Sequence, residues 1–171
     1  VQIYTDNVVT HLRAFGNEIF FFGKEDDLPD VDIIWDSTCT GAQYPNRKIL
    51  NTAIPWMVTV HGASNLSLPL KYNFISFAEK LKGLYLNLKR KTVWSWYKYK
   101  VAHVITVSKY AKEELVNYLN FSPTFISVIY HGYDDNLFYR QSGTKPYLLH
   151  VSAYQPKKNV DRIIEAYQSI K

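Results

Sequence analysis

Apolar and polar residues along the chain form blocks typical of short buried strands joined by amphipathic helices. In the clearest block the β-branched run Val104 to Val107 precedes Ser108, a residue type that caps helix N-termini. Apolar residues then recur at helical spacing as far as Asn120, and Phe125 to Tyr130 forms a second apolar run. A strand, helix, strand order with apolar strands predicts a parallel sheet covered on both faces.

The same patterns predict elements in the rest of the chain. A helix is expected near the start, because Val8, Leu12 and Phe15 have helical spacing before Gly16. Further strands are predicted at Glu18–Phe22, Val31–Trp35, Trp56–Val60 and Tyr147–Val151, and further helices at Asn46–Thr52, at Tyr72–Lys89 and after Asn159. The predicted fold class is α/β, a Rossmann-like parallel sheet flanked by helices.

Ligands of open α/β sheets bind outside the carboxyl ends of the strands. His61 and Gly62 follow one predicted strand, Ser108 follows the next, and His131 and Gly132 follow the third. Glycine lets a backbone approach a ligand closely. These five residues are therefore expected to line a cleft, although the pattern alone favours a loop histidine satisfied by the local backbone at His61.

Composition narrows the class of protein. A chain of 171 residues with 47% hydrophobic and 16% aromatic content can bury one sizeable core, which excludes disordered and fibrous classes. The lone Cys39 excludes an internal disulfide framework, suits a reducing compartment and is best read as a small buried hydrophobe. No apolar run has the length of a membrane span, and no signal peptide is visible. The net charge of +5 favours anionic partners without choosing among them.

One segment interleaves basic and aromatic residues. Basic side chains attract anionic headgroups, and Trp and Tyr settle at membrane interfaces, so this segment is a candidate membrane-surface site. Its members are Lys89, Arg90, Lys91, Trp94, Trp96 and Lys98. A solvated basic face whose aromatics pack into the core explains the pattern equally well. Single-stranded nucleic acid ranks third, because no recognition-module signature accompanies the segment.

A second basic site precedes the last predicted helix. Lys157 and Lys158 lie just ahead of Asn159, a suitable N-cap, and free amides at a helix N-terminus favour an anion. This arrangement would suit a pyrophosphate. Lysines at a helix start are otherwise often only solvated charges.

Three successive segments carry a family resemblance. They read V-I-T-V-S-K-Y-A-K-E-E-L, then I-S-V-I-Y-H-G-Y-D-D-N-L-F, then Y-L-L-H-V-S-A-Y-Q-P-K-K-N-V. Together they resemble the middle of family 4 retaining glycosyltransferases, which have the two-domain GT-B architecture. The resemblance implies an acceptor-side Rossmann-like domain over residues 1–138 that lacks its first strand, a linker over 139–145, and the first strand and helix of the nucleotide-sugar-binding domain over 146–171. A sequence truncated at both ends, inactive by itself, is expected on this basis.

The resemblance also assigns roles to residues. The family's T-V-H motif places its histidine facing the donor sugar, which makes His61 the expected catalytic residue. Donor binding is expected at Ser152, Lys158 and Asn159, while Ala153 stands where the family has an Arg that stabilises the leaving diphosphate.

The implied reaction moves a sugar from a UDP- or GDP-linked donor to a hydroxyl of a saccharide or lipid-linked acceptor, with retention of configuration. No cofactor and no metal are expected, and a cytoplasmic location with peripheral contact at an anionic membrane is expected. Two other classes stay open: a non-catalytic α/β ligand-binding domain and a membrane-surface adaptor. His103 and His131 stand where the family commonly has Asp and Asn, so the donor sugar, the acceptor and the linkage stay open.

Overall fold

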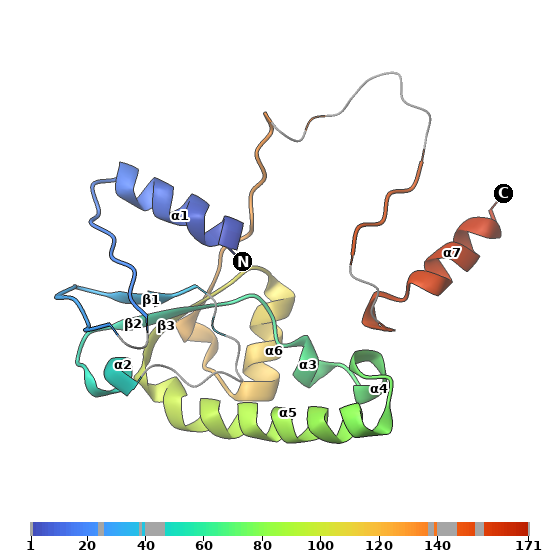
Figure 1. The fold of residues 1–171 in the computed structure, drawn as a ribbon, viewed down its shortest axis with the longest axis horizontal. Coiled ribbons are helices and arrows are strands. Elements are labelled where there is room, and N and C mark those ends of the chain that lie inside the picture. Colours follow the sequence, from blue (N-terminus) through green and yellow to red (C-terminus); the bar gives the residue numbers. More distant parts are fainter. Residues whose placement is uncertain are drawn as a thin grey trace.

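A four-stranded parallel sheet forms the centre of the computed structural model, which describes residues 2–23, 26–37, 39, 47–136, 139, 147–152 and 156–170. The strands are β1 (Ile34–Asp36), β2 (Trp56–Val60), β3 (Val101–Thr106) and β4 (Ile126–Val128), and they follow one another across the sheet in chain order (Figure 1). Each neighbouring pair is parallel; Val58 pairs with Val104, and Val104 with Ile126. The predicted Rossmann-like α/β class is confirmed, and the sheet is consistent with the N-terminal half of the GT-B architecture that the resemblance implies.

Helices flank the sheet on both sides. In chain order they are α1 (Gln2–Ala14), α2 (Arg47–Asn51), α3 (Ser64–Ser67), α4 (Leu70–Asn73), α5 (Phe77–Tyr97), α6 (Lys109–Leu119) and α7 (Val160–Gln168), with short 3-10 turns η1 (Lys98–Lys100), η2 (Pro123–Phe125) and η3 (Pro156–Lys158). Helix α1 lies on one side of the sheet, and α5 and α6 lie on the other (Figure 1). The cover is incomplete, because Ala102 of β3 and Ser127 of β4 are exposed, whereas Val58 of β2 and Val104 of β3 are completely buried.

The core lies between the sheet and helices α5 and α6. Val58, Val104 and Leu115 are completely buried there. Trp94 of α5 packs edge-on against Phe121, with ring centroids 5.4 Å apart. These contacts fix α5 and α6 beneath the strands and so hold the strand ends in place.

Two predicted helix boundaries are confirmed by their caps. Ser108 precedes α6, and its hydroxyl accepts a 3.0 Å hydrogen bond from the Ala111 amide. The helix ends at Asn120, which has a left-handed φ of 54°. Asparagine tolerates this conformation better than most residues. Helix α6 therefore begins and ends at the residues that the sequence indicated.

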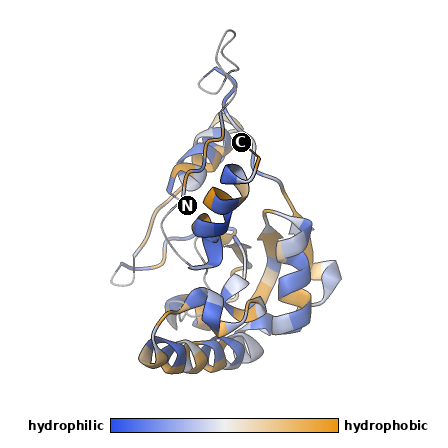
Figure 2. Cartoon of the chain, turned by 90° about the vertical axis from the view of Figure 1, so that its right-hand side faces the viewer, coloured by the Kyte–Doolittle hydropathy of each residue, from blue (hydrophilic) through white to orange (hydrophobic). Residues whose placement is uncertain are grey.

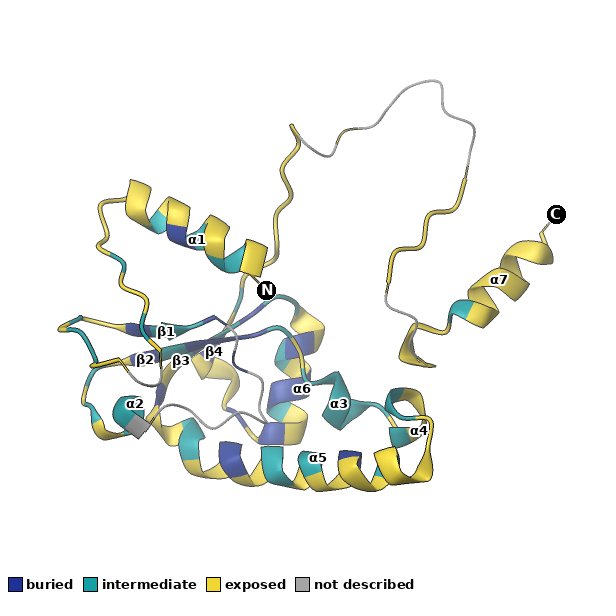
Figure 3. Ribbon diagram, in the orientation of Figure 1, coloured by how far each residue is buried: buried dark blue, intermediate teal, exposed yellow. Residues whose placement is uncertain are grey.

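Three local predictions are wrong. Residues 18–22 form no strand: Phe20 and Phe21 are exposed, and no ladder partner lies beside them within the described part of the chain. Residues 147–151 are likewise extended, unpaired and exposed (Figure 3). The capping bond expected of Asn159 is absent too: the residue occupies the predicted N-cap position of α7, with a φ of 53°, but its side chain makes no capping hydrogen bond. The expected linker lies outside the described residues apart from Tyr139.

The helix predicted over Tyr72–Lys89 is wrong at its start: α4 ends at Asn73, and α5 begins at Phe77 and runs on to Tyr97. Hydrophobic and hydrophilic residues alternate along α5 (Figure 2). The inner face includes Val93 and Trp94, which are buried in the core. The face that the sequence pattern picked out instead points into solvent, and Phe77, Leu81 and Leu88 on it are all exposed. The spacing identified a real apolar stripe, but this stripe is opposite the core.

Candidate functional site

His61 lies at the carboxyl end of β2, at the edge of the sheet where ligands of open α/β folds bind. Its Nε2 is 3.1 Å from the backbone oxygen of Ser37, which follows β1. Because a carbonyl oxygen only accepts, Nε2 carries the proton and Nδ1 is the acceptor nitrogen of the neutral ring. Gly62 follows with φ +151°, a conformation that L side chains rarely adopt.

Three rings from separate parts of the chain gather around this point. The imidazole of His61 stacks on that of His131, with centroids 5.6 Å apart and planes inclined by 19°. Tyr4 of α1 meets both rings edge-on, at 5.2 Å from His61 and 4.9 Å from His131. The resulting cluster, which we call the Tyr4–His61–His131 cluster, brings together α1, the end of β2 and the loop after β4.

The sheet itself holds this cluster in register. Because all strands are parallel, their carboxyl ends emerge on one edge. Beyond β4 the Ile129 amide donates to the Thr106 carbonyl at 2.8 Å, which extends the pairing toward His131. On the other flank the Trp35 indole donates to the Thr59 hydroxyl at 2.9 Å. The loops that carry the rings therefore start from fixed positions.

The electrostatics of the site favour a neutral imidazole. Partial burial lowers the pKa of His61 below its usual value, the hydrogen bond to the Ser37 carbonyl opposes this, and the nearby His131 lowers the pKa further. A neutral ring can donate through Nε2 and accept through Nδ1 at the same time. Hydroxyl-rich ligands offer both kinds of partner.

Three residues around the cluster escaped sequence reasoning. Tyr4 carries no local signal, because its contacts depend on where α1 folds back. Ser37 is buried, and its hydroxyl accepts a 2.7 Å hydrogen bond from Thr5. Glu114 is buried within the apolar stripe of α6, and its carboxylate accepts from the Ala63 amide at 2.7 Å and from the Ser67 hydroxyl. Glu114 could have been recognised from the sequence, because a carboxylate between Ala111 and Leu115 interrupts a stripe that faces the core.

The other predicted cleft residues have varied environments. Ser108 uses its hydroxyl to cap α6. Gly132 is exposed, and a side chain added there would meet no heavy atom of the described residues within 4 Å.

The predicted donor-binding residues lie on a separate segment. Ser152, Lys158 and Asn159 are exposed beyond residue 146, where η3 lies against α4 and the chain runs apart from the sheet (Figure 1). His61, in contrast, contacts Tyr4, Ser37 and His131. The structure therefore does not bring Lys158 to His61, and Ala153 lies outside the described residues.

The basic and aromatic segment divides between core and surface. Trp94 is 2% exposed and belongs to the core, so its assignment to a membrane surface is wrong. Trp96 is 75% exposed. The four basic residues of the set lie on or near the surface; Arg90 donates to Asn87, and Lys98 to the Asn120 carbonyl. Because Trp94 and Trp96 are two positions apart on one helix, they point in different directions.

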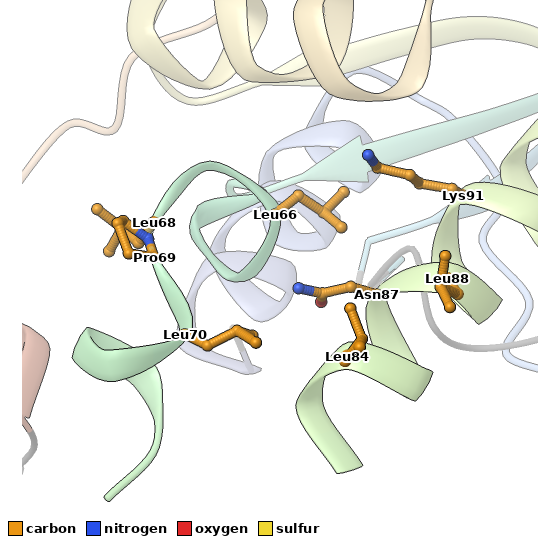
Figure 4. Close-up of a pocket in the computed structure, with 8 residues that line it drawn as sticks. All are labelled: Leu66, Leu68, Pro69, Leu70, Leu84, Asn87, Leu88 and Lys91. Carbon is orange, nitrogen blue, oxygen red and sulfur yellow. The ribbon is translucent and has the colours of Figure 1, made fainter. Parts of the chain in front are cut away.

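A shallow apolar depression lies beside this helix. It holds about 230 Å³ between the α3–α4 connection and α5 (Figure 4). Its walls are formed by Leu66, Leu68, Pro69, Leu70, Leu84, Asn87, Leu88 and Lys91. None of its lining residues belongs to the Tyr4–His61–His131 cluster, so the depression and the cluster are separate features.

No metal centre is evident in the described part of the chain, where no three His, Cys, Asp or Glu side chains gather as ligands would. One Asp-x-Asp pair, Asp30 and Asp32, precedes β1 at the amino end of the sheet, whereas His61 follows the carboxyl end of β2.

Comparison with known proteins identifies the family. The model of Glycosyltransferase Family 4 matches residues 10–137, which include β1 to β4 and helices α2 to α6 in full. No curated protein and no solved structure matches the chain. Since the match spans most of the 171 residues and contains His61 and His131, the chain belongs to Glycosyltransferase Family 4.

Proposed function

We propose that this protein transfers a sugar from a nucleotide-diphosphate donor, UDP- or GDP-linked, to a hydroxyl of a saccharide or lipid-linked acceptor, with retention at the anomeric carbon. The observation that carries the proposal is the Tyr4–His61–His131 cluster at the carboxyl edge of the sheet in a family 4 domain. Aromatic faces and imidazole nitrogens together suit a sugar ring, which has both apolar and hydroxyl surfaces.

In the proposed mechanism His61 orients the reacting sugar. Its Nε2–H is held by the Ser37 carbonyl, so the ring cannot turn freely, and Nδ1 is the nitrogen that can accept from a sugar hydroxyl. Fixing the sugar in a reactive geometry lowers the entropy cost of reaching the transition state. No metal and no cofactor enter this scheme.

Charge on the departing diphosphate needs a cationic partner. We propose Lys158 for that role, with Ser152 and Asn159 beside it on the same segment. Lys158 would have to approach His61 when the donor binds, since η3 lies against α4 in the structure. Stabilising the leaving group electrostatically requires no covalent nucleophile.

The reaction is tested by following the anomeric configuration. The protein is incubated with a saccharide acceptor and, in turn, α-linked UDP-glucose, UDP-N-acetylglucosamine and GDP-mannose, and the first-formed glycoside is examined by proton NMR. An α product that appears with release of the nucleoside diphosphate, and that is lost in His61→Ala, supports the proposal. A β product contradicts retention, and equal turnover by His61→Ala contradicts the role of His61.

We also propose contact with an anionic membrane surface, and one observation favours it. Phe77, Leu81, Leu84 and Leu88 recur on α5 every three or four residues and are all exposed. On a helix such positions share one face, within roughly a third of the circumference. The apolar depression opens beside the same helix.

Charge argues for an anionic lipid surface as the partner. Lys80 and Lys82 alternate in sequence with the stripe residues, and Lys89 and Lys91 follow the last of them, whereas Glu79 is the one acidic residue of α5. Amphipathic helices with basic residues bind anionic interfaces by burying their apolar face and by charge attraction. None of the described helices is both long and apolar enough to cross a membrane.

Vesicle sedimentation tests this contact. Leu84→Ser combined with Leu88→Ser should abolish binding to vesicles rich in phosphatidylglycerol, whereas Leu148→Ser, at an exposed leucine elsewhere, should not. Binding should weaken as salt rises. Equal binding to neutral phosphatidylcholine vesicles would contradict the role of charge attraction. If the protein binds no vesicles but forms a dimer that the two leucine substitutions disrupt, the partner of the stripe is a second copy of the chain.

A further inference from the structure

Glu114 is an unusual core residue. It is 3% exposed, and among the described residues it is the one acidic or basic side chain that is buried. It lies on α6 beside Leu115, in a stripe that otherwise packs against the sheet. Buried carboxylates are costly unless hydrogen bonds compensate for lost hydration. The partners of Glu114 therefore indicate what it does.

Both carboxylate oxygens of Glu114 are directed at the turn that follows β2. Oε2 accepts from the Ala63 amide at 2.7 Å, and Oε1 accepts from the Ser67 hydroxyl of α3. Hydrogen bonds to an ionised acceptor are stronger than neutral ones. A single side chain of α6 thus holds both Ala63, the residue before α3, and Ser67, the last residue of α3.

Gly62 lies between His61 and this anchor. Its φ of +151° is one that L side chains rarely adopt, and a Cβ at Gly62 would lie 3.6 Å from Glu114 Oε2. The carboxylate therefore packs directly against the glycine backbone. On the other side His61 is held by the Ser37 carbonyl. The stretch from His61 to Ala63 is fixed at both ends, by Ser37 and by Glu114.

We propose that Glu114 is a positioning residue for the transferase site: its carboxylate fixes the turn after β2 and so sets the orientation of His61. The effect of Glu114 on catalysis rests on the proposed function, whereas its effect on the orientation of His61 does not. Because Glu114 is buried and its carboxylate is directed at Ala63 and Ser67, it acts through His61 and not on the ligand itself.

The chain offers well-matched variants. Glu114→Ala removes both acceptors. Glu114→Gln keeps an oxygen that can accept from the Ala63 amide, and its NH₂ group can donate to the Ser67 hydroxyl, because a hydroxyl accepts hydrogen bonds as well as donating them. This variant should therefore restore the turn in part. Glu113→Gln alters the exposed neighbouring carboxylate and is the control.

The first readout is the imidazole of His61, observed by nitrogen-15 NMR of histidine-labelled protein over a pH range and assigned with His61→Gln. In Glu114→Ala we expect the His61 resonances to shift and its titration midpoint to move up toward that of an exposed histidine, while Glu113→Gln matches the wild type. A loss of thermal stability with unchanged His61 resonances would show a merely structural role and overturn the proposal.

The second readout is calorimetric affinity for the nucleotide sugar that binds best. We expect Glu114→Ala to weaken binding about tenfold, Glu114→Gln to weaken it less, and Glu113→Gln to leave it unchanged. If wild-type protein binds no nucleotide sugar, the proposed function fails while the NMR result still decides the role of Glu114.

If Glu114→Ala does not fold, Ser67→Ala takes its place, because this variant removes one of the two hydrogen-bond donors to Glu114. Shifted His61 resonances in Ser67→Ala support the proposal, and unchanged ones overturn it.

Discussion

The imidazole rings of His61 and His131 stack with centroids 5.6 Å apart and planes inclined by 19°, although the two residues are 70 positions apart in the sequence. Two like charges in this arrangement repel, so at least one ring is favoured in the neutral state. Partial burial first, and His131 second, lower the pKa of His61.

Stability should therefore depend on pH through His61. A histidine whose folded pKa lies below its unfolded value of about 6.5 binds fewer protons when folded, so the free energy of unfolding rises with pH between the two values. At pH values below both pKa values, the free energy of unfolding has fallen by the full amount that His61 contributes. Urea unfolding from about pH 5 to about pH 8 measures this slope. His61→Gln should flatten it, and an equal slope in that variant would assign the effect to another group.

Gly83 of α5 should tolerate no side chain. A Cβ there would lie closer than 3.0 Å to three atoms of the Phe74 ring. Gly83→Ala should destabilise the protein by about 1–3 kcal/mol by displacing that ring, even though alanine favours helix. Gly132→Ala, where nothing within 4 Å opposes a Cβ, is the control. A Gly83→Ala variant as stable as the control would show that Phe74 repacks freely.

Ser108 should contribute to stability through its cap. Ser108→Ala removes the acceptor of the Ala111 amide and should cost about 1 kcal/mol, whereas Ser108→Asp retains an N-cap acceptor and should cost less. Chemical denaturation measures both. If the two variants lose equal stability, the hydroxyl does not act as a cap.

Cys39 should be unreactive in the folded protein. It is buried, and burial, aided by the nearby Asp36 charge, raises the pKa of its thiol far above the usual range. The thiolate is the reactive form, so a disulfide reagent should label one thiol only after denaturant is added. Fast stoichiometric labelling of native protein would contradict this environment.

Local signals predicted the elements that carry the site, and tertiary pairing decided the rest. The strand Trp56–Val60 and the helix after Ser108 were predicted at their observed positions, because a continuous apolar run and a capping residue are local properties. Residues 18–22 have comparable strand propensity but no ladder partner in the described chain, and pairing is what makes a strand.

The candidate site was predictable only in part. His61 and His131 follow strands, and a parallel sheet brings strand ends to one edge, so their proximity follows from topology. Tyr4 could not be anticipated, because its place depends on the path of the chain between α1 and β1. The apolar stripe of α5 was recognised, but periodicity does not say which of two apolar faces meets the core.

The most direct test of the central claim, that the carboxyl end of β2 is the donor site, is calorimetric titration of UDP- and GDP-sugars into three forms of the protein. The forms are wild type, His61→Ala and His103→Ala, the last altering a histidine that lies within β3 and contacts Ser127. The account predicts that one donor class binds, that His61→Ala weakens it tenfold or more, about 1.4 kcal/mol, and that His103→Ala leaves it unchanged. Equal affinity in all three forms, or no binding by folded wild-type protein, would contradict it.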